Sequence, residues 1–175
     1  MFKVRKFKVF IRNDFKLNRY STLNFELKKM SISEIENEIT EEFEMFDDWM
    51  QKYEHLIELG KSLPLIDPQY KTEDKLIKGC QAQVWLHSKF KDGKIIYTAD
   101  SDAIITKGMV ALMIRVLSDH TPDEIMNAKL DFVEKIGLTQ HLSPTRSNGL
   151  VSMIKQMKLD AVAYKMKAPA AKGEL

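Results

Sequence analysis

Alternating hydrophobic and polar residues in the middle of the chain predict a β-hairpin. Over residues 83–90, one side of the expected strand carries Val84, Leu86, Ser88 and Phe90, and the other carries Trp85, His87 and Lys89. Asp92-Gly93 follows, and this dipeptide favours a two-residue type I′ turn because both central positions need positive φ. Residues 94–101 are then expected to return as the second, antiparallel strand.

The turn fixes the register of these two strands. Pairing Lys91 with Lys94 sets four further pairs opposite each other: Phe90 with Ile95, Leu86 with Ala99, Trp85 with Asp100, and Gln83 with Asp102. The acidic residues Asp100 and Asp102 therefore lie at the end of the hairpin away from the turn. An alternative is that Ser101 or Asp102 only caps the helix that follows.

Hydrophobic residues recur every three or four positions over residues 31–60, which predicts one amphipathic helix. They are Ile35, Ile39, Phe43, Phe46, Met50, Tyr53 and Ile57. Either Ser33 or Ser31, each with a glutamate three positions later, matches the capping box that begins many helices. Gly60 is expected to end this helix.

The second half of the chain predicts further helices. Residues 104–117 are apolar around most of a helical circumference, which indicates a helix buried on several sides. Thr121-Pro122 begins another helix, residues 131–136 form a short one closed by Gly137, and Ser143-Pro144 opens the last. Its apolar stripe is Leu150, Ile154, Met157, Ala161 and Tyr164. This order predicts a single α+β domain with a small antiparallel sheet flanked by helices.

Charge is distributed unevenly along the chain. Residues 1–29 carry a formal charge of +7 and the rest carry −5, within a total of +2. We expect residues 1–29 to be a basic leader outside the domain: a disordered tail, the product of a start codon assigned too early, or an arm for targeting or anionic surfaces. Residues 30–167 form the expected domain and 168–175 a flexible tail. Because the basic character lies outside the domain, nucleic acid is not an expected partner.

Composition narrows the class of protein. The chain has 175 residues, of which 44% are apolar, and no uncharged apolar run long enough to span a bilayer, so a membrane is not an expected partner. Its single cysteine has no partner for an internal disulfide, and its four histidines lack the close spacing of a zinc site. We therefore expect a reducing, cytoplasmic location and no metal.

That single cysteine, Cys80, is the candidate reactive group. It follows Gly79 and precedes the predicted strand, in a polar stretch that suits a loop. A buried structural thiol is the alternative. A Cys–His hydrolase needs one of the four histidines as base, and no local pattern favours it, because His141 is equally consistent with a structural role. An iron–sulfur cluster held by this chain alone is disfavoured, because cluster sites use several thiolates and this chain has one cysteine.

Four segments together resemble one family. They are Gly-Cys-Gln-Ala-Gln-Val-Trp at 79–85, Ile-Glu-Leu-Gly-Lys-Ser-Leu-Pro at 57–64, Asp-Ser-Asp-Ala at 100–103 followed by Lys107-Gly108, and Leu-Thr-Gln-His-Leu-Ser-Pro-Thr-Arg-Ser-Asn-Gly-Leu at 138–150. They are similar to the SufE family of cysteine desulfuration proteins, whose compact α+β fold is shared with IscU-like scaffolds. The resemblance covers residues 30–164 and leaves the leader outside.

The resemblance implies a sulfur carrier that is not a stand-alone enzyme. A cysteine desulfurase (SufS-like), which holds its own pyridoxal phosphate, would pass persulfide sulfur to Cys80 and be stimulated by this partner. Cys80 would then deliver the sulfur to an iron–sulfur assembly scaffold (SufBCD-like), and this chain would need no cofactor itself. The alternative is a non-catalytic partner-binding module whose cysteine is only packed.

We further expect the Cys80 loop to move. A persulfide must be shielded from oxidants and reductants at rest and exposed during transfer, with Gly79 as one hinge. Asp102 and Arg146 are candidates to tune the thiol: Arg146 matches the family's Arg-Ser block and would lower the pKa of Cys80 or pair with Asp102. The alternative for Arg146 is a surface charge at a helix N-terminus.

Overall fold

The computed structural model describes residues 30–63 and 66–167. Within them the order of helices and strands is α1 (Ile32–Glu44), α2 (Trp49–Lys61), the 3₁₀ turns η1 (Pro68–Tyr70) and η2 (Glu73–Lys75), β1 (Val84–Lys91), β2 (Lys94–Ser101), α3 (Ile104–Leu117), α4 (Pro122–Asn127), α5 (Phe132–Lys135), α6 (Leu138–His141) and α7 (Pro144–Lys167). The predictions for the leader 1–29 and the tail 168–175 lie outside the described residues. The α+β prediction is confirmed.

The β-hairpin forms with the predicted register. Strands β1 and β2 pair antiparallel, with Lys91 opposite Lys94 and Trp85 opposite Asp100. Asp92 has φ 51° and Gly93 has φ 78°, so the turn has the positive φ angles that the dipeptide predicted. Beyond the strands, the backbone N–H of Asp102 donates to the carbonyl of Gln83 at 3.2 Å, which continues the pairing to the end away from the turn.

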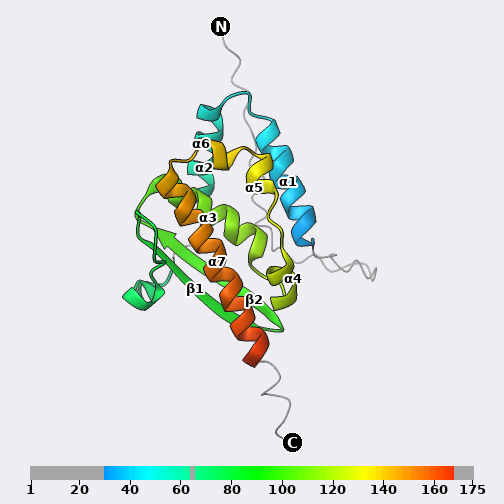
Figure 1. The fold of residues 1–175 in the computed structure, drawn as a ribbon, viewed down its shortest axis with the longest axis vertical. Helices are drawn as coiled ribbons and strands as arrows, with labels where there is room; N and C mark the ends of the chain where they lie inside the picture. Colours follow the sequence, from blue (N-terminus) through cyan, green and yellow to red (C-terminus); the bar gives the residue numbers. More distant parts are fainter. Residues whose placement is uncertain (1–29, 64–65, 168–175) are drawn as a thin grey trace, which may run out of the picture.

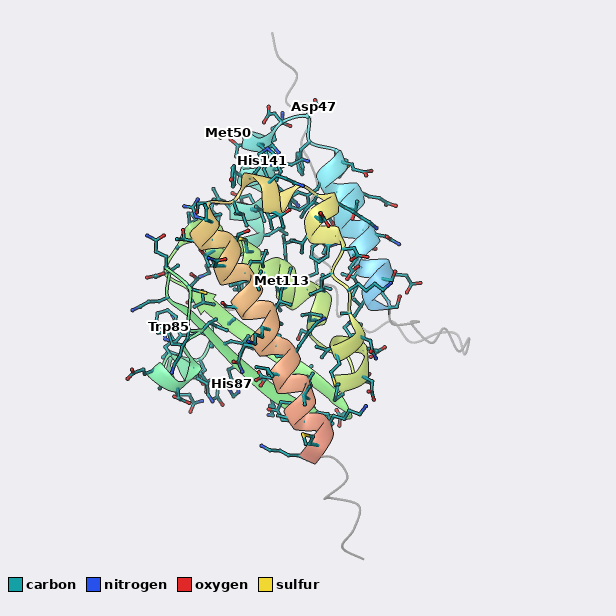
Figure 2. The ribbon with its side chains drawn as sticks, in the orientation of Figure 1. Asp47, Met50, Trp85, His87, Met113 and His141 are labelled. Carbon is teal, nitrogen blue, oxygen red and sulfur yellow. The ribbon has the colours of Figure 1, made fainter. Side chains whose placement is uncertain are left out.

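Helix α3 is the centre of the core. It packs against β2 on one side and against α2, α1 and α7 on others (Figure 1). Its buried residues are Gly108, Met109, Val110, Leu112, Met113, Val116 and Leu117, and Met113 lies in the middle of the molecule in Figure 2. The predicted helix 104–117, buried on several sides, is confirmed at both ends and in its burial.

The single helix predicted over residues 31–60 is wrong, because two helices occupy this range. Helix α1 ends at Glu44, and α2 starts again at Trp49. The carboxylate of Asp48 accepts a hydrogen bond from the backbone N–H of Gln51 at 2.9 Å, which caps α2 and favours a new helix start. After the break the predicted stripe faces the core only in part: Met50 is 69% exposed, whereas Tyr53 packs against the core.

Gly60 does not end α2, contrary to expectation. Helix α2 continues to Lys61, and Gly60 lies inside it against α3. A Cβ atom on Gly60 would lie 2.8 Å from the backbone nitrogen of Gly108, closer than real Cβ contacts. The two glycines therefore let the backbones of α2 and α3 touch, which leaves room for no side chain between them.

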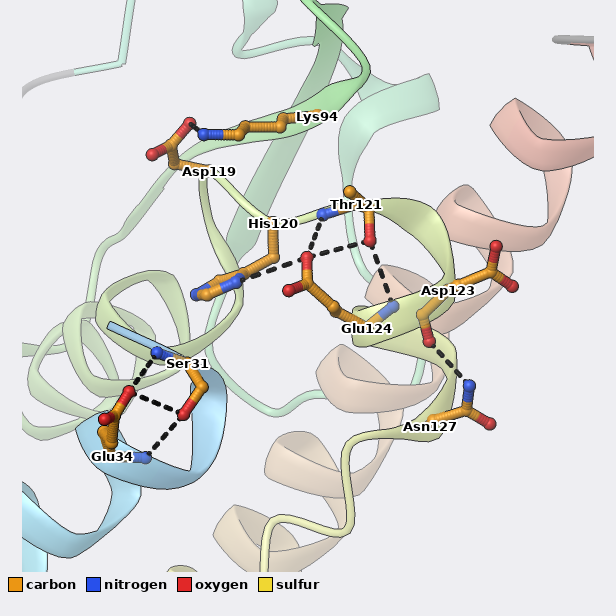
Figure 3. Close-up of polar contacts among 9 residues, drawn as sticks. All are labelled: Ser31, Glu34, Lys94, Asp119, His120, Thr121, Asp123, Glu124 and Asn127. Atoms are coloured by element: carbon orange, nitrogen blue, oxygen red, sulfur yellow. Dashed lines mark hydrogen bonds and ion pairs between the residues drawn. The ribbon is translucent and has the colours of Figure 1, made fainter. Parts of the chain in front are cut away.

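Two helix starts use the same capping device. In α1 the N–H of Ser31 donates to Glu34 at 2.7 Å, so the Ser31 register is the one that forms. In α4 the N–H of Thr121 donates to Glu124 at 2.7 Å, as Thr121-Pro122 predicted (Figure 3). Each serine or threonine hydroxyl accepts the N–H of its glutamate in return, at 3.3 Å in both helices.

The last helix, α7, lies along the hairpin from its open end to its turn. Gly149, near the N-terminus of α7, contacts Cys80, while Tyr164, near the C-terminus, donates its hydroxyl proton to the carbonyl of Ser88 at 2.8 Å (Figure 1). The short helix α6 was not predicted. No described helix has the length and apolar character that crossing a membrane requires.

Candidate functional site

Cys80 lies in a short loop, residues 78–83, that leaves and rejoins the sheet at one point. The N–H of Ile77 donates to the carbonyl of Val84 at 2.8 Å, which closes the loop at its base. Gly79, inside the loop, has φ +89°, a conformation that L-residues rarely adopt. The loop is therefore closed at its base by a backbone hydrogen bond, and the positive φ at residue 79 favours glycine there.

Helix α7 provides the contact for the thiol. The Cys80 Sγ donates a hydrogen bond to the backbone carbonyl of Gly149 at 3.5 Å. A Cβ atom on Gly149 would lie 3.1 Å from that sulfur, tighter than most real Cβ contacts. The sulfur therefore rests directly on the backbone of α7, at a point where any larger side chain on residue 149 would have to push it away.

The environment of Cys80 favours the neutral thiol. The residue is half-buried, and burial raises the pKa of its thiol above the ordinary value because the thiolate loses hydration. Only the thiolate attacks sulfur, so the resting conformation holds Cys80 in a poorly reactive form. Exposure of the loop to water would remove the cause of this shift.

A pocket of about 340 Å³ opens beside the thiol. Its apolar wall comes from the loop, the hairpin, α3 and α7: Ala82, Val84, Ala103, Met109, Leu150 and Met153. Its polar lining is Gln81, Asp102, Thr106, Thr145 and Arg146. The structure thus brings the three predicted site residues, Cys80, Asp102 and Arg146, to a single pocket.

Asp102 holds one end of the loop. Its carboxylate accepts the N–H of Gln83 at 2.9 Å, while its own N–H donates to the Gln83 carbonyl. The alternative that Ser101 or Asp102 only caps the next helix is wrong, because Ala103 is the N-cap of α3 and has no side-chain cap bond. The Ser101 hydroxyl accepts the N–H of Ala103 itself, before the first turn of the helix. Arg146 is exposed in the first turn of α7. The tuning roles of Asp102 and Arg146 stay predictions.

The four histidines, all in the described part of the chain, do not line this pocket. His141 stacks on Trp49 with ring centroids 3.7 Å apart, and His87 stacks on Tyr70 at 3.6 Å. Figure 2 shows His141 in α6 and His87 on the hairpin, toward opposite ends of the molecule. The geometry offers no base to Cys80, so it does not support a Cys–His hydrolase.

Gly149, whose backbone contacts the Cys80 sulfur, is the residue of the candidate site that sequence reasoning missed. In the sequence it stands out only as part of a family segment, without a role. A glycine inside a helix costs about 1 kcal/mol relative to alanine, so Gly149 within a long helix was itself a signal of close packing.

Within residues 30–63 and 66–167, no three His, Cys, Asp or Glu side chains gather in a way that would hold a metal ion.

Known proteins match most of the chain. Residues 37–161 match the SufE family model, described as an Fe-S metabolism associated domain. An Arabidopsis thaliana protein, "SufE-like protein 1, chloroplastic/mitochondrial", is 39% identical over 131 residues, 74% of this chain. The match covers only 35% of that protein, so the chain spans about a third of its length. An uncharacterized SufE-like protein of Synechocystis is 38% identical, with 73% of this chain and 80% of that one covered.

A third relative and a solved structure extend the comparison. An uncharacterized SufE-like protein of Rhizobium meliloti is 37% identical over 71% of this chain and 93% of its own length. The solution structure of a hypothetical protein from Thermus thermophilus has the same fold, with a TM-score of 0.63 at 18% identity, over 74% of this chain and 94% of that one. The matched residues 37–161 include the Cys80 loop and all the pocket residues. The chain belongs to the SufE family.

Proposed function

We propose that Cys80 accepts persulfide sulfur from a cysteine desulfurase and carries it to an iron–sulfur assembly scaffold. Membership of the SufE family indicates a role in sulfur transfer with a cysteine desulfurase. The observation that carries the proposal further is the position of the chain's single thiol, held on a short loop with its sulfur against Gly149 and an apolar-walled pocket beside it.

The transfer needs one thiolate from this chain. The desulfurase presents a cysteine persulfide, and the Cys80 thiolate attacks its outer sulfur. One S–S bond forms at Cys80, the S–S bond of the donor breaks, and the desulfurase cysteine leaves as a thiolate. The proton of the Cys80 thiol passes to water or to the leaving thiolate, and no external oxidant or reductant takes part. The second transfer repeats this exchange with the scaffold as acceptor.

The resting geometry protects the unloaded thiol, and release of the loop would permit exchange. At rest, burial raises the pKa of Cys80 and keeps the thiol neutral, which protects it from oxidation. Transfer requires the loop to leave α7, which breaks the contact with Gly149 and the pairing between Gln83 and Asp102. Opening restores the hydration of Cys80 and therefore raises the fraction present as thiolate, so exposure and reactivity rise together.

The recipient must supply the thiol that discharges the persulfide. This chain has a single cysteine and therefore no second thiol to resolve it internally. Sulfur on Cys80 is then retained until another protein attacks it, as a carrier between two partners requires. We assign the recipient to the SufBCD-like scaffold class and the donor to the SufS-like class.

Intact-mass spectrometry tests the proposal. The protein is incubated with a SufS-like desulfurase and L-cysteine, alongside the Cys80→Ser variant. We expect one reductant-labile sulfur atom added to the parent and none to the variant, with both proteins still binding the desulfurase. No added sulfur on the parent, with a desulfurase shown to be active, would contradict the proposal and favour the partner-binding module.

A further inference from the structure

Asp100 is a buried carboxylate that does not line the Cys80 pocket. Its side chain is 8% exposed and lies between two ammonium groups. The Lys71 Nζ is 2.6 Å from one carboxylate oxygen, and the Lys107 Nζ is 2.7 Å from the other. Lys71 directly follows η1, while Lys107 lies in α3, so one acidic group joins β2 to two other segments.

Asp100 also shapes the corner that holds the C-terminal stem of the Cys80 loop. Its Oδ1 accepts the N–H of Ser101 at 2.9 Å, and the Ser101 hydroxyl accepts the N–H of Ala103 at 3.3 Å. Asp102, between these two residues, makes both bonds to Gln83. Fixing the corner at Asp100 therefore fixes the group to which this stem is attached.

The N-terminal stem is connected to the same carboxylate through Trp85. This residue pairs with Asp100 across the hairpin and bridges to Leu76 on the other side. The Lys71 ammonium that bonds Asp100 also lies over the Trp85 ring, 5.5 Å from its centroid. Figure 2 shows Trp85 on the outer side of the hairpin, beside the segment that carries the 3₁₀ turns. Both stems of the loop are thus attached to a cluster centred on Asp100.

The cluster depends on the negative charge of Asp100. Burial alone would raise the pKa of this carboxyl, but hydrogen bonds from Lys107 and Lys71 hold it below its usual range. The group is therefore ionised at neutral pH. Without its charge, two neighbouring ammonium groups would remain partly buried with no counter-ion. The attraction that holds the Lys71 ammonium over the Trp85 ring would also be lost.

We propose that Asp100 is a positioning residue: together with Lys71 and Lys107 it holds both stems of the Cys80 loop and so sets how readily the loop opens. The inference rests on the proposed function only in one respect: that opening of the loop serves sulfur transfer. The conformational claim concerns the isolated protein. It needs no partner and no sulfur, so it stands or fails separately from sulfur transfer.

Alkylation of Cys80 by iodoacetamide tests the claim on the full chain. For Asp100→Asn we expect the plateau rate, the limiting rate of the thiolate, to rise about tenfold, since local opening limits access. This rate is obtained by fitting the pH profile below about pH 10, where the lysine ammonium groups of the cluster keep their charge. The full pH profile is needed, because it separates a change in the plateau rate from a change in the midpoint, which reports the thiol pKa. A change of midpoint with an unchanged plateau would overturn the claim.

Glu42→Gln is the matched control. Glu42 is likewise a partly buried carboxylate with two strong hydrogen bonds, to Arg115 at 2.7 and 2.8 Å, but it joins α1 to α3 away from the loop. We expect comparable loss of global stability from this variant and a plateau rate within about twofold of the parent. An equal acceleration in both variants would show that any destabilisation opens the loop.

Two more variants keep the test informative if Asp100→Asn does not fold. Lys71→Met leaves Asp100 paired with Lys107 and should accelerate alkylation less than Asp100→Asn does, whereas Lys107→Arg should preserve the parent rate. Hydrogen exchange gives a second readout: the amides of Ile77 and Gln83 should exchange faster in Lys71→Met, while those within α3 should not change. Unchanged exchange at these two amides, together with an unchanged plateau rate in Lys71→Met, would overturn the claim.

Discussion

Two glycines on different helices each let a neighbour come unusually close, and the neighbours differ in kind. Gly108 of α3 meets the backbone of α2, where Gly60 adds the second close approach. Gly149 of α7 meets the sulfur of Cys80, the end of a side chain on a loop. A backbone inside two packed helices has nowhere to move, whereas a loop side chain has. The same residue type thus serves a permanent contact in the core and a releasable one at the site.

Gly108→Ala should break the permanent contact and have the largest effect. A methyl group there would overlap the backbone carbonyl of Leu56, so α2 and α3 must separate. We expect a loss of about 3 kcal/mol or more in the free energy of unfolding, as for other severe overpacking. Urea denaturation measures this loss. Ile104→Ala on the same helix is the control, because Ile104 is 56% exposed and its truncation should be nearly neutral.

Gly149→Ala should break the releasable contact with much less cost. The new methyl group would displace the Cys80 sulfur rather than backbone, and alanine stabilises the helix by about 1 kcal/mol relative to glycine. We expect stability within about 1 kcal/mol of the parent and alkylation of Cys80 accelerated severalfold. In a Cys80→Ala background the same substitution should become stabilising. A large loss of stability in both backgrounds would show that Gly149 packs as Gly108 does.

The smallest expected effect is a difference between the parent and Cys80→Ser in how the free energy of unfolding depends on pH. The pKa of Cys80 is raised in the folded state, so the neutral thiol stabilises the fold at pH below its unfolded value of about 9.0. That contribution is lost as the pH rises from there through the raised folded value. Urea denaturation between pH 7 and 10 should therefore show a steeper decline for the parent than for Cys80→Ser. Parallel curves would mean that burial does not shift this thiol.

The elements that sequence predicted best were those governed by local rules. The Asp92-Gly93 turn determines the hairpin register, and Thr121-Pro122 determines a helix start, because turn and capping chemistry act over a few residues. The break between α1 and α2 was missed because the apolar spacing continues through it, although Asp48 was a visible capping residue. Helix α6 has only four residues, too few for a periodic pattern.

The site was predicted only in part for a similar reason. Cys80 was evident as the single cysteine, and the register placed Asp102 near the start of β1. The contact of Gly149 with the sulfur joins residues far apart in the chain, and so does the bond from Lys71 to Asp100. Such contacts follow from how α7 and the 3₁₀ segment pack on the hairpin, which no local spacing encodes.

The position of Lys71 over Trp85 gives the loop an optical signal of its own. The chain has two tryptophans, and the other, Trp49, is stacked on His141 near α6. A cation near an indole ring changes the energy of its excited state, so departure of the Lys71 ammonium should alter the emission of Trp85. With Trp49 replaced by phenylalanine, the intrinsic fluorescence of the protein would report the stem of the Cys80 loop in real time, without a label on the thiol that carries the sulfur.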